Sequence, residues 1–198
     1  MNDNEKPMEN KRLRIIIAAT AVFSRKGFHR AKIEEIAEEA DVGKGTVYEY
    51  FASKKELFLE MILHTHDQYQ DRVRQDLFGA DTIYEKLQAL FDVTMQFLEQ
   101  HKEMAKILLA DHPPVDEETH RFLMEKEQQK IEDFSKVLDA AVERKEIRPV
   151  NTNAAARVIL GSLALTGSQI VFYDNINELD SKKLTQDVID ILLHGLQA

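Results

Sequence analysis

Apolar residues recur every three to four positions along most of this chain, a spacing that places them on one face of a helix. No strand-like alternation of useful length and no internal repeat interrupts this pattern. We therefore predict an all-α protein of about nine helices. The expected helices span about residues 9–26, 33–40, 44–51, 53–77, 82–100, 103–110, 116–144, 151–173 and 180–196.

The segment from residue 33 to residue 51 contains two short amphipathic helices joined by a very short connection. Residues 33–40 place four apolar side chains on one helical face, at positions i, i+3, i+4 and i+7. The connection is Asp41-Val42-Gly43, and the second helix turns Val47 and Phe51 inward, one turn apart. Two helices joined so tightly form a helix-turn-helix, whose second helix fits the major groove of B-DNA. This segment therefore predicts a DNA-binding protein.

Particular residues mark where the N-terminal helices begin and end. Gly27 stands where a helix needs a residue with positive φ after its last turn, and Phe28 can make the accompanying apolar contact. Asp41 adopts a left-handed backbone more readily than most residues other than glycine. Gly43 is an acceptable N-cap for the helix that follows it. Residues 53–56 have the S-x-x-E spacing of a capping box, which predicts the start of the next helix.

The net charge of −9 is unevenly distributed along the chain. Residues 1–55 hold 11 Lys or Arg and 9 Asp or Glu, whereas the remaining residues hold 15 and 26. The basic residues are thus concentrated where the helix-turn-helix lies, and the acidic excess belongs to the rest of the chain. An acidic body is repelled by DNA, which lowers the affinity but favours one orientation of the bound protein.

Several functional classes find no support in the composition. The chain has no Cys, which excludes disulfides and thiolate metal sites. No apolar run approaches the roughly 18 residues of a transmembrane helix, and residues 1–10 lack the apolar stretch of a signal peptide. We expect a cytoplasmic protein with no membrane partner. No nucleophile is paired with a base and no His pair has metal-ligand spacing, so we expect no enzyme activity, no metal and no cofactor.

An ordered set of residues runs through the three N-terminal helices. It reads Ile15-Ile16-x-Ala18-Ala19-x-x-Val22-Phe23-x-x-x-Gly27-Phe28, then Ile33-x-x-Ile36-Ala37-x-x-Ala40-x-Val42, then Gly45-Thr46-Val47-Tyr48-x-Tyr50-Phe51-x-x-Lys54-x-x-Leu57. Over residues 14–59 this set resembles the DNA-binding domain of the TetR family of bacterial transcriptional regulators. The resemblance implies an all-helical homodimer that binds DNA through its first three helices. It also implies a variable body for a small ligand and a dimer interface built from the last two helices.

We expect residues 1–55 to form the DNA-binding domain and residues 56–198 to form a ligand-binding and dimerisation domain. Lys44 and Tyr48 lie one turn apart and would reach phosphates or base edges. Lys54 places a cation at the positive end of a helix, where a nearby phosphate would explain it. The alternative for these positions is an exposed side chain with no partner, or for Tyr50 packing under the turn. The candidate DNA contacts are Lys32, Lys44, Gly45, Thr46, Tyr48, Tyr50 and Lys54.

Large, adaptable Met and Phe side chains are the one indication of a ligand in the second domain. As a set they favour an apolar or amphipathic small molecule. Ordinary core packing is the simpler interpretation for any single one of them. The candidate ligand-binding residues are Phe91, Met95, Met104, Ile107, Phe122 and Phe134.

The segment 154–172 combines small residues, which permit close approach of helices, with large apolar ones. Together with the apolar stripe of the last helix, two copies of this segment can form a four-helix bundle between protomers. The alternative is a helix buried inside one chain. The candidate dimer-interface residues are Gly161, Leu165, Gly167, Val188 and Leu192.

These patterns together predict a transcriptional repressor. As a homodimer it would bind an inverted-repeat operator, and a small ligand would release it by favouring a conformation with the wrong spacing between the two DNA-binding helices. The alternative is a DNA-binding architectural or co-regulatory protein without a small-molecule effector. Ligand-dependent release from DNA separates the two. A helical enzyme with an incidental helix-turn-helix finds no support in the arrangement of residues.

Overall fold

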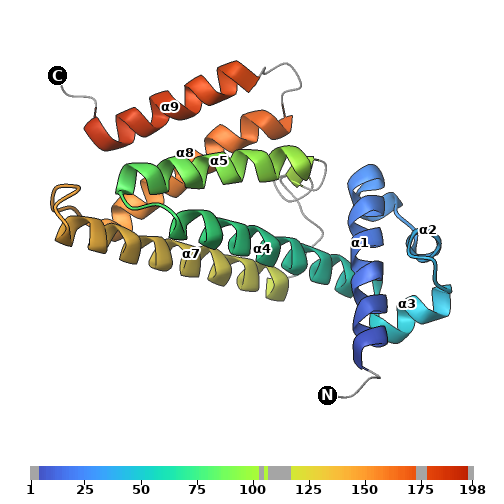
Figure 1. The fold of residues 1–198 in the computed structure, drawn as a ribbon. Helices are drawn as coiled ribbons and strands as arrows, with labels where there is room; N and C mark the ends of the chain where they lie inside the picture. Colours follow the sequence, from blue (N-terminus) through green and yellow to red (C-terminus); the bar gives the residue numbers. More distant parts are fainter. Residues whose placement is uncertain (1–4, 103–104, 107–116, 173–177, 196–198) are drawn as a thin grey trace. The chain divides into compact units, whose positions relative to one another are not determined.

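The computed structural model describes residues 5–102, 105–106, 117–172 and 178–195, which form eight helices and no strand (Figure 1). The helices are α1 (Glu5–Arg30), α2 (Ile33–Glu39), α3 (Lys44–Tyr50), α4 (Lys54–Phe78), α5 (Ile83–Gln100), α7 (Glu117–Glu143), α8 (Thr152–Phe172) and α9 (Glu178–His194). The all-α prediction is confirmed. The short helix expected at residues 103–110 falls mostly outside the described residues.

The chain divides into two compact units. The first contains α1, α2, α3 and the part of α4 up to Gln68, and the second contains α4 from Tyr69 on together with α5, α7, α8 and α9. Leu57, Phe58 and Met61 of α4 are buried within the first unit. Helix α4 therefore contributes residues to both units. The domain boundary expected after residue 55 stays a prediction.

An aromatic cluster forms the centre of the first unit. The ring of Phe58 lies edge-on to Phe23 (5.1 Å between centroids) and to Phe28 (4.9 Å), and Phe28 stacks on Phe23 (5.9 Å). Gly27 (φ 71°, ψ 165°) redirects the chain into this cluster by interrupting the regular helix of α1. Its positive φ and the end of the regular helix before it agree with the prediction, and a further short helical segment then carries α1 to Arg30.

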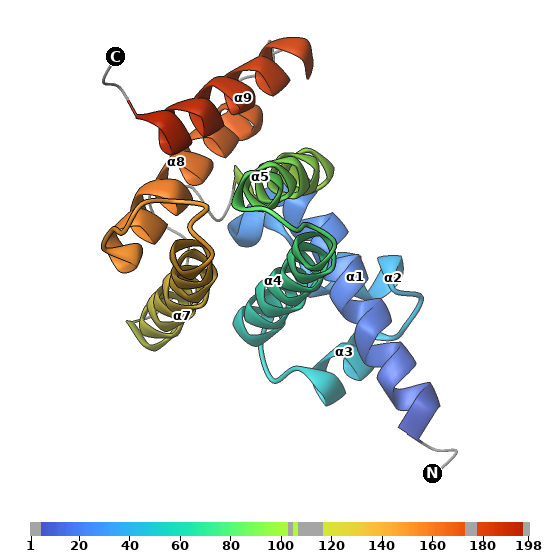
Figure 2. The same ribbon diagram turned by 60° about the vertical axis from the view of Figure 1, so that its left-hand side comes forward.

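Helix α8 is the central element of the second unit. It contacts α5, α7 and α9 (Figure 2), and apolar side chains from all four helices form one buried cluster. Among the described helices, α8 has the length and apolar composition of a membrane span, but one of its faces is buried in this cluster, as in core helices. The buried members are Ile83, Leu87, Leu90, Phe91, Met95, Ile131, Phe134, Leu138, Ala141, Ala156, Ile159, Leu160, Leu163, Ile170 and Ile189.

Gly167 lies where α8 packs against α5 of the same chain. A Cβ atom added to Gly167 would overlap the Cδ1 atom of Leu98 and would lie 3.6 Å from the Cε atom of Met95. The same atom added to Gly161, earlier on α8, would meet nothing within 4 Å. Packing inside one chain thus accounts for the missing side chain at Gly167, and its role in a dimer interface stays a prediction.

We expect Gly167→Val to lower the free energy of unfolding by about 1 kcal/mol, because the half-buried side chain of Leu98 must move away from the added methyl groups. Gly45→Val is the control, since it makes the same side-chain change in a helix at an exposed position where the added Cβ atom meets nothing within 4 Å. Urea unfolding followed by circular dichroism, at equal protein concentrations, measures both variants. Equal losses of stability in the two variants would show that the space at Gly167 has no special importance.

Candidate nucleic-acid interface

The connection between α2 and α3 has the geometry of a tight helix-turn-helix turn. Asp41 has a left-handed backbone (φ 52°), as predicted. Gly43 (φ −72°, ψ 149°) is the N-cap of α3, also as predicted. Val47 and Phe51 are each 1% exposed, so the predicted inward face of α3 is buried. The opposite face of α3 is left for contacts outside the chain.

Arg14 of α1 holds this turn in place. Its guanidinium donates to the carbonyl oxygens of Ala40 (2.5 Å) and Asp41 (3.1 Å) and pairs with the Asp41 carboxylate (3.3 Å). These carbonyls lie at the negative, C-terminal end of α2, where helices leave acceptors unpaired and where a cation is stabilising. The sequence pattern did not indicate this contact, because the partners are far apart along the chain.

The exposed face of α3 brings the predicted contact residues together. Lys44, Gly45 and Tyr48 are exposed, and Thr46 and Tyr50 are half-buried. The exposed fraction of Tyr48 is 47%, and a Cβ atom added to Gly45 would meet nothing within 4 Å. This face is therefore open to a duplex, while the individual contacts with DNA remain predictions.

Lys44 has a partner on the neighbouring helix. Its Nζ atom lies 2.6 Å from an Oε1 atom of Glu34 on α2 and 5.9 Å from the centroid of the Tyr48 ring. The hydrogen bond between them raises the pKa of Lys44 and lowers the pKa of Glu34, so both side chains are charged at neutral pH. The sequence pattern singled out Lys44 and Tyr48 but not Glu34.

Lys54 and Lys32 lie at the starts of α4 and α2. The Nζ atom of Lys54 lies 4.6 Å from the centroid of the Phe28 ring and donates to the carbonyl oxygen of His29 (3.2 Å). Burial lowers the pKa of Lys54. Lys54 thus stabilises the end of α1, a role that neither sequence-based alternative included. Lys32 is exposed, and its backbone N–H donates to the Glu35 carboxylate (3.3 Å).

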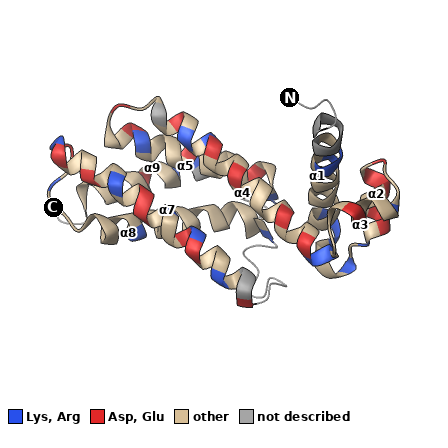
Figure 3. Ribbon diagram, turned by 90° about the horizontal axis from the view of Figure 1, so that it is seen from below, with Lys and Arg blue, Asp and Glu red and all other residues tan. Residues whose placement is uncertain are grey.

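Acidic residues gather on α2 beside basic residues of α1 (Figure 3). Such exposed ion pairs contribute little to stability one by one. They do neutralise part of the basic charge that the sequence places in residues 1–55. Attraction for DNA must therefore come from fewer cations than the number of basic residues indicates. Besides Lys44–Glu34 and Arg14–Asp41, the pairs include Arg25–Glu39 (2.6 Å), Lys26–Glu35 (2.9 Å) and, with Glu60 of α4, Arg12–Glu60 (2.6 Å).

Three of the predicted ligand-binding residues lie in the hydrophobic core of the second unit. Phe91, Met95 and Phe134 are at most 8% exposed and belong to the cluster around α8. Phe122 is half-buried near the start of α7, with the Lys126 Nζ atom 5.3 Å from its ring centroid. The other two candidates, Met104 and Ile107, lie outside the described residues. The ligand site stays a prediction.

The predicted dimer-interface residues differ widely in exposure. Leu165 is 71% exposed and Gly161 is also exposed. Val188 and Leu192 of α9 are half-buried against the core cluster, and Gly167 is buried. The outer face of α8 is therefore the part of this set that is available to a second chain.

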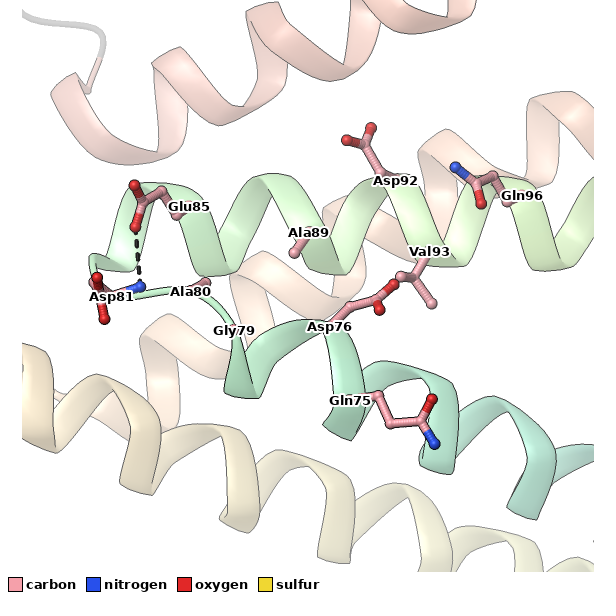
Figure 4. Close-up of a pocket in the computed structure, with 10 residues that line it drawn as sticks. All are labelled: Gln75, Asp76, Gly79, Ala80, Asp81, Glu85, Ala89, Asp92, Val93 and Gln96. Carbon is pink, nitrogen blue, oxygen red and sulfur yellow. Dashed lines mark hydrogen bonds between the residues drawn. The ribbon is translucent and has the colours of Figure 1, made fainter.

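An open pocket of about 590 Å³ lies between the end of α4 and α5 (Figure 4). Glu85 accepts a hydrogen bond there from the backbone N–H of Asp81 (3.0 Å). Burial raises the pKa of Asp92, and the positive charge of Lys182 partly opposes this shift. The polar lining differs from the apolar site expected for a ligand. No group of carboxylates or His in the described residues has an arrangement that could hold a metal ion. The lining residues are Gln75, Asp76, Gly79, Ala80, Asp81, Glu85, Ala89, Asp92, Val93 and Gln96.

A partly buried polar pair joins α4 to α5 in the second unit, and no sequence motif indicated it. The Thr94 hydroxyl donates its one hydrogen to the carbonyl oxygen of Leu90 (2.7 Å). The Thr94 oxygen can therefore only accept from the Tyr69 hydroxyl, which lies 2.8 Å away. The Phe97 ring lies between Tyr69 (5.2 Å between centroids) and His101 (4.4 Å). Burial raises the pKa of Tyr69 and lowers the pKa of His101. These residues place hydrogen-bonding groups beside the apolar interior.

Two family profiles match this chain and together cover most of it. The profile of bacterial regulatory proteins of the tetR family matches residues 15–61. The profile of the tetracyclin repressor-like C-terminal domain matches residues 80–196. The first match contains the helix-turn-helix, and the second contains most of the body.

Individual proteins are similar over different lengths. The fatty acid metabolism regulator protein of Bacillus subtilis is 23% identical over 187 residues, which are 94% of this chain and 95% of that protein. The transcriptional activator FasR of Mycolicibacterium smegmatis is 31% identical over 105 residues, which are 53% of this chain and 48% of that protein. This second match therefore spans about half the length of FasR.

Solved structures share the fold at low sequence identity. FadR from Bacillus subtilis in complex with stearoyl-CoA has a TM-score of 0.81 and 22% identity, covering 93% of this chain and 99% of that one. AibR in complex with isovaleryl coenzyme A and operator DNA has a TM-score of 0.71 and 18% identity, covering 92% and 98%. Both structures resemble this chain in fold over nearly their whole lengths.

We expect Arg14→Met to reduce stability by about 1 kcal/mol, because it removes charged but partly exposed hydrogen bonds to the turn. Asp41→Gly in the same background should recover part of this loss, since glycine adopts positive φ without strain. Arg25→Met, which removes the exposed pair with Glu39, is the control. Thermal unfolding and amide hydrogen exchange at residues 41–44 provide the measurements. Faster exchange in both arginine variants alike would contradict a particular role for Arg14.

Proposed function

This chain belongs to the TetR family of bacterial regulatory proteins, and we propose that it represses transcription from an inverted-repeat operator until an acyl thioester binds its body. It is a DNA-binding transcriptional regulator whose first three helices carry the helix-turn-helix. Regulators of this family bind operator DNA as dimers. A symmetric dimer presents two copies of α3, which is why the proposed operator has twofold symmetry.

The exposed face of α3 is the observation that carries the proposal. Val47 and Phe51 anchor α3 in the core, so Lys44 and Tyr48 are presented by a helix that cannot easily rotate. We assign base-edge or phosphate contacts to Lys44, Gly45, Thr46, Tyr48 and Tyr50. Lys32 and Lys54, at the starts of the neighbouring helices, are assigned to phosphates.

An acyl thioester is the ligand class that we propose for the body. The Bacillus subtilis relative that matches over almost its whole length is a regulator of fatty acid metabolism. Two proteins of similar fold were solved with stearoyl-CoA and isovaleryl coenzyme A. In this chain, the buried Phe91, Met95 and Phe134 offer an apolar and adaptable interior for an acyl chain. An inserted chain would displace core side chains, so the occupied body would differ in packing from the empty one.

Release from DNA requires the ligand to prefer the conformation that does not fit the operator. To shift a balanced equilibrium about a hundredfold, the ligand needs roughly 2.7 kcal/mol of preference for that conformation. At about 25 cal/mol per Å², this corresponds to roughly 110 Å² of additional apolar burial. A long acyl chain has that much surface, whereas a short polar metabolite does not.

The outer face of α8 is the dimer interface that we propose. Val158 (62% exposed), Gly161, Leu165 (71%) and Phe172 (50%) follow one another at intervals of three, four and seven residues, which keeps them on one side of the helix. Ile191 of α9 (47% exposed) adds apolar area, and α8 contacts α9. Two such helices from each protomer form a four-helix bundle. A dimer that covers this face is in keeping with a protein of the cytoplasm, which we also propose.

We expect the purified protein to select a common, roughly twofold-symmetric sequence from random DNA, and stearoyl-CoA to release it from that sequence. Fluorescence anisotropy of the labelled operator measures the release. Free coenzyme A is the control for the nucleotide portion, and isovaleryl-CoA tests the importance of acyl length. Selection of no common sequence would refute sequence-specific regulation. Specific binding that no acyl thioester affects would favour a DNA-binding protein without a small-molecule effector.

We expect Leu165→Asp to raise the dimer dissociation constant at least a hundredfold, because each dimer would bury two unpaired carboxylates. Met124→Asp, which changes a residue of α7 that is 53% exposed, is the matched control and should leave the dimer intact. Sedimentation velocity at micromolar concentration distinguishes the species. A dimer that survives Leu165→Asp would show that this face of α8 is not the interface.

A further inference from the structure

Glu34 of α2 lies against the only basic residue of α3. The sequence of α3 is KGTVYEY, so Lys44 is its sole cation and Glu49 its sole carboxylate. The Glu34 carboxylate lies 2.6 Å from the Lys44 ammonium, and the two side chains are 59% and 52% exposed. Glu34 and the two charged residues of α3 together carry one more negative charge than positive. Such a surface is unusual for a helix that approaches phosphates.

This arrangement affects the two kinds of DNA contact differently. An ammonium group has three N–H donors, and Glu34 uses one of them. A guanine edge in the major groove presents two neutral acceptors, O6 and N7, and a Lys44 that stays bonded to Glu34 keeps two N–H groups for such acceptors. A phosphate is an anion instead. It must compete with the carboxylate for Lys44, and it is repelled by that carboxylate if the pair stays closed.

We propose that Glu34 is a specificity-determining residue, which withholds Lys44 from phosphates and leaves it available to a guanine in each half-site. The proposal rests on the function proposed above. Glu34 then lowers the affinity for DNA without the operator sequence more than it lowers the affinity for the operator. This is discrimination by an unfavourable interaction with the wrong partner. The shifted pKa values of both side chains agree with a closed, charged pair in the unbound protein.

Glu34→Gln tests this role, with Glu38→Gln as its matched control. Glu38 is an exposed carboxylate one turn further along α2, and it forms no ion pair with any residue that the structure describes. Anisotropy titrations use the selected operator and a scrambled duplex of equal length at several salt concentrations. We expect Glu34→Gln to bind the scrambled duplex about five to ten times more tightly and the operator at most about twice as tightly. The salt dependence on scrambled DNA should steepen by about 0.9 per protomer, since each Lys44 then neutralises one phosphate.

A second comparison removes Lys44. In a Lys44→Gln background, Glu34→Gln should change binding no more than Glu38→Gln does, because the withheld cation is absent. When Lys44 is replaced, the protein should also lose its preference for guanine at one position of each half-site in the sequences that it selects. Unfolding curves of all variants should coincide with the wild type, since the exchanged side chains are exposed.

The role of Glu34 would be overturned if Glu34→Gln and Glu38→Gln had equal effects on both duplexes. It would also be overturned if the effect of Glu34→Gln persisted without Lys44. These results leave the proposed function intact, because the wild type would still bind its operator specifically. A wild type that binds the operator and the scrambled duplex equally well would instead refute the proposed function.

Discussion

The position of α3 depends on one residue with a left-handed backbone and on the arginine that holds that residue in place. Asp41 turns the chain from α2 into α3, and Arg14 binds the carbonyl oxygens of Ala40 and Asp41 from α1. A glycine would adopt this backbone without strain, whereas an aspartate requires support. The guanidinium supplies it and at the same time satisfies acceptors at the end of a helix. The burial of Val47 and Phe51 then fixes the rotation of α3 about its axis.

Local features of the fold could be predicted from the sequence, and contacts between distant residues could not. The all-helical fold, the positive φ of Gly27, the cap at Gly43 and the inward face of α3 each follow from a few neighbouring residues. The pair of Lys44 with Glu34 and the packing of Gly167 against Leu98 instead join different helices. Helical periodicity shows which face of a helix is buried but not which residues lie opposite it. The ligand candidates follow from residue type alone, and residue type does not distinguish a core from a pocket.

The second unit combines an apolar interior with a few hydrogen-bonding groups that are already satisfied. The Tyr69 and Thr94 hydroxyls bond to each other and to the backbone, at the junction of α4 and α5. Met95, adjacent to Thr94, packs towards Gly167 on α8. A molecule that moved Met95 would therefore affect both a flexible apolar contact and a directional polar one. In the function proposed above, such coupling would let a bound ligand change the preferred arrangement of α4 and α5.

The division of α3 into a buried face and an exposed face has a consequence for how such a protein evolves. Val47 and Phe51 are enclosed, while Tyr48 is half exposed and Gly45 has open space around its backbone. Substitutions at exposed positions such as Gly45 and Tyr48 therefore disturb little packing, and surface changes of this kind shift stability by only about 0.5 kcal/mol or less. Operator preference is then free to drift by single substitutions while the scaffold stays folded. A duplicated copy of this chain can acquire a new regulatory target without first passing through an unstable intermediate.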